Sequence, residues 1–432
     1  MKKMKKIFIY THSCNLRSLD ASRMRSYFSQ NNYQIVNNPK DADTIFYISC
    51  AAYDYVADKS LQKVKEFKKF DAELIVAGCL PEIEKKSVAE IFDGATIGTK
   101  DLDKNPEKID ELFLENKIKF KDIDDTNISF ENLDEGKLIG VIKTILNKIQ
   151  WAEKVVIKIR DHVFKNLLNE NSFFYGLVMD KPYRIRISWG CPNSCSYCGI
   201  KKAIGPHKSK PLEQCTEEFK NGLKKDYKHF LINADDVGAY GIDTGHSFPE
   251  LLDKMTKIPG EYKITITNLN PRWVVKYIDK LEDIFERQKI TRLCIPIQSG
   301  CSRILKIMNR YSDVEKIKDA FQRLRTTFPD VQVSTHIMAG FPSETEEEFK
   351  ESLSLIQECN ISAGQVIPFS CKRGTKAELI EEKISEYEIV QRLKYGRLFL
   401  KNAGYNVISQ GYATVSLPSM SKVKAFLFEK MD

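Results

Sequence analysis

The first part of the chain, residues 1–117, alternates short apolar runs with stretches whose apolar side chains recur at helical spacing. The runs are rich in Ile, Phe, Tyr and Val, which favours β-strands. A regular alternation of strands and helices is typical of a doubly wound parallel sheet, so an N-terminal α/β domain is predicted. The predicted strands are residues 7–10, 43–49 and 73–77, and the predicted helices are residues 22–31 and 56–70.

A second series of the same kind covers residues 183–375. Six strand candidates alternate with helical stretches there, which predicts six β/α units with parallel strands. A complete TIM barrel has eight such units, so we expect an open, partial barrel whose chemistry lies at the carboxyl ends of the strands. The predicted strands are residues 183–188, 229–233, 262–267, 291–297, 331–337 and 364–368.

Two regions lie outside these series. Residues 118–182 form a connector that begins as an acidic loop, and residues 137–168 have apolar side chains every three or four positions, which predicts one long amphipathic helix or two. The polar positions of that stretch are rich in cations, so it is either a helix with a solvated face or a docking element for substrate or RNA. Residues 376–432 predict a short C-terminal helix, near residues 386–400, and a tail.

Composition narrows the class of protein. Of the 432 residues, 42% are hydrophobic and 29% are charged, which is ordinary for a soluble chain of more than one domain. No apolar run approaches the roughly 18 residues of a membrane span, and the apolar run after the basic start is too short for a secretory signal, so a cytoplasmic protein is expected. The formal charge of +8 permits a polyanionic partner such as RNA without requiring one.

Three cysteines stand close together just after the first strand of the second series. Cys191, Cys195 and Cys198 form a C-x3-C-x2-C loop. Close thiolates form a soft site suited to an iron–sulfur cluster or to zinc. A 4Fe–4S cluster usually takes four cysteines, so three would leave one iron open to a small chelating molecule. The alternatives are a structural zinc site short of one ligand and a chance arrangement.

Three further cysteines, Cys14, Cys50 and Cys79, each follow one of the predicted strands of the N-terminal domain. The carboxyl ends of strands in an open parallel sheet share one edge, where ligands bind. One such cysteine would mean little, because cysteine is a common buried residue. Three at equivalent positions favour a second three-thiolate site. A reduced cluster with an open iron can pass an electron to a bound molecule, and this can lead to a radical on a substrate carbon. A second cluster with an open iron could present a sulfur atom to that radical. Two such sites in one chain therefore indicate sulfur insertion.

The chain resembles the radical SAM methylthiotransferases over roughly residues 5–405. The blocks Thr11-His-Ser-Cys14, Ile48-Ser-Cys50 and Val76-Ala-Gly-Cys79 are similar to the family's N-terminal cysteine motifs, and the loop at Cys191 matches the motif of its S-adenosylmethionine (SAM) cluster. Later blocks match in the same order: Gln298-Ser-Gly300, Met308-Asn-Arg310, Gly340-Phe-Pro-Ser-Glu-Thr345 and Arg373-Gly-Thr375.

The resemblance implies two 4Fe–4S clusters and SAM as cofactors. The three N-terminal cysteines would hold an auxiliary cluster that carries the sulfur, and the three loop cysteines would hold the cluster that binds SAM. One SAM would supply a methyl group and a second would supply a 5′-deoxyadenosyl radical. Tyr197, beside Cys198, is well placed to pack on the adenine of SAM. The other cofactor contacts that the resemblance implies are Asp236, Gln298, Ser299 and Gly340.

Several positions depart from the family pattern, although all six cysteines are present. The departures concern the surroundings of the clusters and the contacts to substrate. Ser13, Arg17 and Ala21 replace a usual glycine, asparagine and serine near the first cysteine, Ile204 and Lys210 replace customary arginines after the SAM loop, and His336 replaces a customary aspartate. Family members also carry a C-terminal RNA-binding TRAM barrel of roughly 40 residues or more, which residues 405–432 are too few to form, so no complete TRAM domain is expected.

Three functions remain open from the sequence. Family substrates are an N6-modified adenosine beside the tRNA anticodon or an aspartate of a ribosomal protein. The basic charge favours tRNA, and the block Asn268-Leu-Asn-Pro271 resembles members that act on threonylcarbamoyladenosine. The expected lack of a TRAM domain motivates the second possibility, the same chemistry on a peptide or protein side chain. A non-catalytic RNA-binding protein with a degenerate site is the third, and the complete ligand set argues against it.

The remaining partners and cysteines are less defined. A one-electron reductant such as flavodoxin or ferredoxin is the expected protein partner. Eleven cysteines, an odd number, fit reduced thiols and metal ligation better than a disulfide framework. Five of them have no role in this scheme, and most are expected to be core residues: Cys215, Cys294, Cys301, Cys359 and Cys371.

Overall fold

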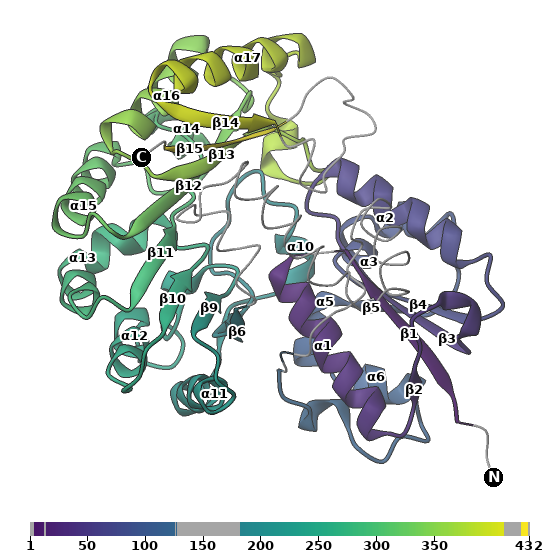
Figure 1. Cartoon of the computed structure of the whole chain (residues 1–432). Coiled ribbons are helices and arrows are strands. Elements are labelled where there is room, and N and C mark those ends of the chain that lie inside the picture. Colours follow the sequence, from purple (N-terminus) through teal and green to yellow (C-terminus); the bar gives the residue numbers. More distant parts are fainter. Residues whose placement is uncertain (1–3, 13, 126, 128–181, 410–424, 431–432) are drawn as a thin grey trace, which may run out of the picture.

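The computed structural model describes residues 4–12, 14–125, 127, 182–409 and 425–430. The chain forms an N-terminal α/β lobe beside a larger lobe built on a curved sheet (Figure 1). The helix predicted over residues 137–168 lies outside the described residues. No helix among the described residues is long and apolar enough to cross a membrane.

The N-terminal lobe is a five-stranded parallel sheet in the order β2-β1-β3-β4-β5. The three predicted strands are its central ones, and the two edge strands are too short to leave an apolar run in the sequence. The strands are β1 (Lys6–Thr11), β2 (Gln34–Ile35), β3 (Thr44–Ser49), β4 (Glu73–Gly78) and β5 (Thr96–Gly98). The helices are α1 (Asn15–Gln30), η1 (Pro39–Asp41), α2 (Asp54–Phe67), α3 (Leu80–Ile83), α4 (Lys85–Ala89), α5 (Thr99–Lys104), α6 (Glu107–Leu112) and η2 (Phe120–Asp122).

Both faces of this sheet are covered, as its strands require. Alternate residues of a strand point to opposite faces, so a strand that is apolar throughout must be buried on both. Phe8 of β1 belongs to a core with Val64 of α2, whereas its neighbour Ile9 belongs to a second core with Tyr27 of α1. The doubly wound arrangement predicted for this lobe is therefore confirmed.

The larger lobe contains six parallel strands in the order β6-β9-β10-β11-β12-β13, which confirms the predicted partial barrel. Two antiparallel strands, β15 and β14, extend the sheet beyond β13. A separate small sheet pairs β7 with β8. The bounds are β6 (Tyr183–Arg186), β7 (Ser188–Trp189), β8 (Lys208–Ser209), β9 (His229–Asn233), β10 (Lys263–Ile266), β11 (Ile290–Cys294), β12 (Gln332–Ala339), β13 (Ala363–Pro368), β14 (Tyr405–Ser409) and β15 (Phe426–Lys430).

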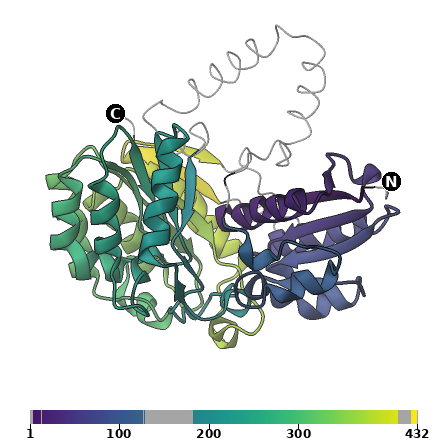
Figure 2. The same ribbon diagram turned by 90° about the horizontal axis from the view of Figure 1, so that it is seen from below.

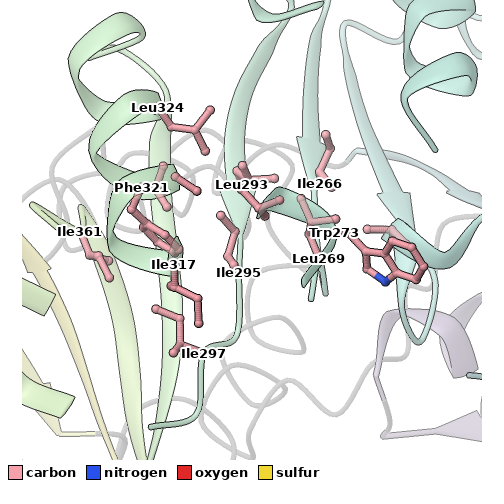
Figure 3. Packing of buried hydrophobic residues seen from close by; sticks show 14 of the residues in the cluster. Ile266, Leu269, Trp273, Leu293, Ile295, Ile297, Ile317, Phe321, Leu324 and Ile361 are labelled. Atoms are coloured by element: carbon pink, nitrogen blue, oxygen red, sulfur yellow. The ribbon is translucent and has the colours of Figure 1, made fainter. Parts of the chain in front are cut away.

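Helices cover the outer face of the barrel sheet (Figures 1 and 2). Leu293, Ile295 and Ile297, at alternate positions on and after β11, point toward Ile317 and Phe321 of the neighbouring helix α15 (Figure 3). The helices are α10 (Lys201–Ile204), α11 (Leu212–Lys224), η3 (Val237–Ala239), α12 (Phe248–Thr256), α13 (Pro271–Phe285), α14 (Ser302–Ile307), α15 (Val314–Thr327), α16 (Glu346–Glu358), η4 (Lys376–Leu379) and α17 (Glu386–Asn402).

A buried ion network joins the two lobes. Arg186 of β6 is almost completely buried and its Nη2 donates to Asp20 Oδ1 of α1 (2.6 Å) and to the Leu16 carbonyl oxygen (3.1 Å). Its Nη1 lies 3.4 Å from Asp103 Oδ1, and its Nε lies 3.5 Å from Asp125 Oδ2. Ion pairs this deeply buried are costly to break, so the network fixes α1 against the first barrel strand.

The start of α1 differs from the prediction. The helix begins at Asn15 rather than at residue 22. Its first turns bury Arg17 and Asp20, which form an ion pair (Nη1 to Oδ2, 2.6 Å) at the boundary with the barrel. Charged side chains at buried positions interrupt the apolar pattern from which a helix is predicted.

Candidate active site

Cys14, Cys50 and Cys79 all follow the carboxyl ends of neighbouring parallel strands. Cys14 is the N-cap of α1 shortly after β1, Cys50 directly follows β3, and Cys79 directly follows β4 as the N-cap of α3. Because β1, β3 and β4 are adjacent in the sheet, the three cysteines stand at one edge, as predicted. Cys14 is exposed, whereas the other two are buried.

These thiols interact electrostatically. Burial raises the pKa of Cys79 to about 11, with the Arg17 guanidinium opposing the rise and Cys14 adding to it. Burial likewise raises the pKa of Cys50, and the charges of Cys79 and Cys14 raise it further. A bound cation would offset the burial and the neighbouring charges that raise these pKa values, so this edge suits a metal centre.

Among the described residues, no group of three His, Cys, Asp or Glu side chains is arranged to hold a metal ion. In a 4Fe–4S cluster, each cysteine ligates a separate iron atom. The assignment of the six cysteines as cluster ligands stays a prediction.

The three loop cysteines lie between β7 and α10, at the carboxyl end of the first barrel strand, and are partly exposed. Later segments of the chain hold this loop. The Ser196 N–H donates to the Met308 carbonyl oxygen (2.9 Å), and Asn309 Nδ2 donates to the Ser194 carbonyl oxygen (2.9 Å). The Met308-Asn-Arg310 block thus serves as the support of the cysteine loop.

Arg310 lies against the same loop. Its Nη1 is 3.6 Å from Cys195 Sγ and 3.4 Å from Tyr197 Oη, and its Nη2 donates to the Pro296 carbonyl oxygen. A fixed guanidinium beside a thiolate strengthens the hydrogen bond to sulfur and orients the ligand. Sequence reasoning assigned no role to Arg310, although it stands in a recognised block. Tyr197 packs on the barrel core, and its predicted contact with adenine stays a prediction.

Asp236 connects the cysteine loop to α13. Its Oδ2 accepts from Asn193 Nδ2 (2.6 Å) and from Trp273 Nε1 (3.0 Å), and the same Asn193 Nδ2 lies 3.3 Å from Cys191 Sγ. The other oxygen, Oδ1, is buried without a hydrogen-bond partner among the described residues. A buried unpaired acceptor beside the loop fits a ligand that supplies a donor, as the amino group of SAM would. The predicted cofactor contact of Asp236 is compatible with this geometry.

Two side chains interact with both cysteine sets. Burial raises the pKa of Cys79 and of Cys198, and the charge of Asp235 adds to the rise at both. Burial also raises the pKa of Tyr53 to about 12, with Cys50 and Cys198 as the further causes. Tyr53 belongs to one lobe and Asp235 to the other, so cysteines of both sets lie within electrostatic range of the same two side chains across the lobe boundary. The sequence does not show that these two residues lie near both cysteine sets, because that proximity arises only from the packing of the lobes.

The other predicted cofactor contacts have clear structural surroundings. Gln298 adopts a left-handed backbone (φ +82°), and its N–H donates to the His336 carbonyl oxygen (2.8 Å). The Ser299 hydroxyl is fully buried, 3.3 Å from Ser352 Oγ of α16. At Gly340 (φ +81°) a Cβ would lie 2.3 Å from Ile389 of α17. Their cofactor roles stay predictions, and the surroundings of Ser299 and Gly340 explain these residues by packing.

The five cysteines left without a role divide into three kinds. Cys215, Cys301 and Cys359 belong to the barrel core. Cys371 is exposed. Cys294 is buried with its Sγ 3.7 Å from His336 Nε2, on the inner side of the barrel.

Comparison with known proteins places these features in two families. Residues 185–356 match the model of the radical SAM superfamily, and residues 6–98 match that of an uncharacterized protein family, UPF0004. The structure is similar to that of the radical SAM methyltransferase TsrM from Kitasatospora setae, with a TM-score of 0.57 at 9% identity, covering 99% of this chain and 88% of TsrM. This likeness concerns the fold.

Two relatives align along most of the chain. A probable threonylcarbamoyladenosine tRNA methylthiotransferase of Pyrococcus horikoshii is 28% identical over 375 residues, which cover 87% of this chain and 79% of the relative. A tRNA-2-methylthio-N(6)-dimethylallyladenosine synthase of Clostridium botulinum is 27% identical over 407 residues, which cover 90% and 80%. The resemblance found in the motifs is thereby confirmed.

Proposed function

This chain belongs to the radical SAM methylthiotransferases, and from that premise we propose that it inserts sulfur into a C–H bond of an N6-modified adenosine in tRNA and methylates that sulfur. The observation that supports the proposal best is the pair of three-cysteine sets, one from each lobe, that interact with the same two side chains, Tyr53 and Asp235. Such an arrangement suits a reaction that needs a radical and a sulfur donor in one space.

The cofactors follow from the two sites. A radical SAM domain implies one 4Fe–4S cluster and SAM, which together supply one-electron cleavage of SAM. The auxiliary cluster at Cys14, Cys50 and Cys79 is part of our proposal. It is supported by the position of these cysteines at three adjacent strand ends.

The protein's own residues would orient these groups and fix the distance between them. Arg310 and Asn193 hold the sulfur atoms of Cys195 and Cys191 by hydrogen bonds. Arg186, through its ion pair with Asp20, holds the lobe that carries the auxiliary cysteines against the barrel. Positioning of this kind matters because reacting atoms must be held within a few tenths of an ångström of their productive geometry.

The substrate is proposed to be tRNA. The names of the two relatives describe methylthiolation of an N6-modified adenosine in tRNA, and the formal charge of +8 suits a polyanionic partner. These points favour tRNA over the peptide substrate considered from the sequence. A one-electron reductant of the flavodoxin or ferredoxin type completes the proposal, since cleavage of SAM consumes an electron.

The test is an anaerobic assay of the full chain, reconstituted with iron and sulfide and supplied with SAM, a reductant and tRNA from cells that lack this gene. We expect mass spectrometry of the digested tRNA to reveal a methylthio nucleoside, together with 5′-deoxyadenosine. A variant with alanine at Cys191, Cys195 and Cys198 is the matched control and should form neither product. Unmodified tRNA from an enzyme that does form 5′-deoxyadenosine, with a methylthio group on a supplied ribosomal peptide, would contradict the proposal.

A further inference from the structure

The fourth strand end of the N-terminal sheet carries a hydroxyl where its neighbours carry thiols. Cysteines follow β1, β3 and β4, and Thr99 directly follows β5, the next strand of the sheet (Figure 1). Gly78 of β4 is aligned with Gly98 of β5. Because Cys79 and Thr99 come next on these two parallel strands, they lie side by side at the edge that holds the auxiliary cysteines.

Thr99 contacts the sulfur of Cys79 directly. Its Oγ1 lies 3.4 Å from Cys79 Sγ, and both residues are buried. A cysteine that ligates iron is a thiolate, which has no proton to donate, so the hydroxyl is the donor in the cluster-bound state. Because both groups are shielded from water, this hydrogen bond is stronger than it would be at the surface.

The structure around Thr99 holds it beside the sulfur. The Gly98 N–H donates to Asp101 Oδ2 (3.0 Å), which closes the first turn of α5. The end of β5 packs on α3, the helix that begins directly after Cys79. A Cβ at Gly98 would lie 2.4 Å from the Glu82 side chain of α3, so this approach is close. The packing therefore fixes the hydroxyl relative to the sulfur.

The other buried auxiliary cysteine is held through its backbone. Ser60 Oγ of α2 donates to the Cys50 carbonyl oxygen (2.6 Å) and lies 3.2 Å from His12 Nε2. Tyr47 Oη lies 3.2 Å from His12 Nδ1. Because a carbonyl only accepts, the Ser60 proton is used there, so His12 Nε2 donates to Ser60 and His12 Nδ1 accepts from Tyr47. These three hydrogen bonds fix the strand end that carries Cys50.

We propose that Thr99 is a positioning residue of the auxiliary site, whose hydroxyl donates to the Cys79 sulfur and raises the reduction potential of the cluster bound there. Ser60 and His12 instead fix Cys50 and determine how completely that cluster is retained. This inference rests on the auxiliary cluster of the proposed function. A hydrogen bond to a ligating sulfur draws negative charge away from the cluster and so favours its reduced state.

The test uses the full chain with alanine at Cys191, Cys195 and Cys198, so that only the auxiliary cluster can form. After anaerobic reconstitution, the iron content is measured and a redox titration is followed by electron paramagnetic resonance. Thr99→Val keeps the shape of the side chain and removes the hydroxyl, so it should lower the reduction potential while the iron content stays that of the parent chain. Thr99→Ser keeps a hydroxyl and should keep the potential of the parent chain.

Two further variants test the second half of the proposal. Ser60→Ala and His12→Phe each break the chain of hydrogen bonds behind Cys50, so both should lower the iron content. The matched control is Thr256→Val, which removes a buried hydroxyl on α12 that donates to the Leu252 carbonyl oxygen (2.8 Å). It should change neither the iron content nor the potential. Circular dichroism checks that each variant folds.

An unchanged potential in Thr99→Val, or the same shift in Thr99→Ser, would overturn the assignment of Thr99. Loss of iron in Thr99→Val to the level of Ser60→Ala would also overturn it, because Thr99 would then have a structural role only. Full iron content in Ser60→Ala and His12→Phe would overturn the role of that pair. These results leave the proposed function intact, whereas a parent chain that binds no iron would overturn the function and this inference together.

Discussion

The two cysteine sets are built in opposite ways. The SAM-loop cysteines come from eight consecutive residues, Cys191 to Cys198, in a loop held by hydrogen bonds from residues 308–310. The auxiliary cysteines come from three strands and are brought together by the order and register of the sheet. The first site therefore depends on local geometry, whereas the second depends on the whole N-terminal lobe. Substitutions in the N-terminal sheet or at the lobe boundary should therefore lower the methylthio product more than 5′-deoxyadenosine.

The largest effect is expected from the local site. Replacement of Cys195 by alanine should abolish formation of 5′-deoxyadenosine and of the methylthio nucleoside, because Cys195 is a proposed ligand of the cluster that would bind SAM. Mass spectrometry of both products measures the effect, and iron analysis should give about half of the wild-type iron, since the auxiliary site is untouched. Exposed Cys371 provides the control, because Cys371→Ala should leave both products and the iron content unchanged.

The next effect tests the boundary between the lobes. Arg186→Met removes a buried cation and leaves Asp20 without it, which should lower the free energy of unfolding by about 3–5 kcal/mol in a denaturant titration. Because the relative position of the lobes is disturbed, methylthio product should fall more than 5′-deoxyadenosine. Arg323→Ala is the control: it removes surface ion pairs with Glu282 and Asp279 and should leave the free energy of unfolding nearly unchanged, because exposed ion pairs contribute little. Equal loss of both products in Arg186→Met would argue against a positioning role.

A smaller effect is expected from Gly78, at the carboxyl end of β4 in the N-terminal sheet. Gly78 precedes Cys79 with φ +97°, and a Cβ there would lie 2.4 Å from the Ser49 carbonyl oxygen, next to Cys50. Gly78→Ala should therefore cost about 2–4 kcal/mol in the free energy of unfolding and reduce the iron bound at the auxiliary site. At Gly245 (φ +79°) no atom lies within 4 Å of the added Cβ, so Gly245→Ala should cost only about 1 kcal/mol and leave the iron content unchanged.

The smallest effect concerns the surroundings of the SAM loop. Arg310→Lys keeps the charge but loses the fork that reaches Cys195 and Pro296 together. The rate of 5′-deoxyadenosine formation should fall about 10- to 100-fold, and the reduction potential of the SAM-loop cluster, followed by electron paramagnetic resonance, should shift. An unchanged potential with a normal rate would show that the contact to Cys195 plays no part in the reaction.

The sequence predicts the two folds well because the central strands of the N-terminal sheet are mostly apolar and each barrel strand carries apolar side chains that pack against the outer helices. The three central strands of the N-terminal sheet and all six barrel strands lie where the sequence predicts them. It fails where polar residues are buried. The buried charges of Arg17 and Asp20 interrupt the apolar pattern at the start of α1, so the sequence predicts that start too late. The contacts of Arg186 join residues that lie far apart in the chain. The edge strands β2 and β5, of two and three residues, leave no pattern at all.

The candidate site shows the same division. Spacing alone identifies the cysteine loop, and strand ends identify the auxiliary set. Sequence reasoning noticed His336 only as a departure from a family pattern and left Cys294 without a role, because their contact depends on the inward alternation of two neighbouring strands. Tyr53 and Asp235 are linked only through the packing of one lobe on the other.

The central claim is that two sites with separate tasks serve one reaction space. It is tested most directly by a variant with alanine at Cys14, Cys50 and Cys79, in which 5′-deoxyadenosine and methylthio nucleoside are measured in the same anaerobic reaction with tRNA. The account predicts that 5′-deoxyadenosine is still formed, that the methylthio nucleoside is absent, and that about half of the iron remains. Methylthio nucleoside formed by this variant would contradict the account.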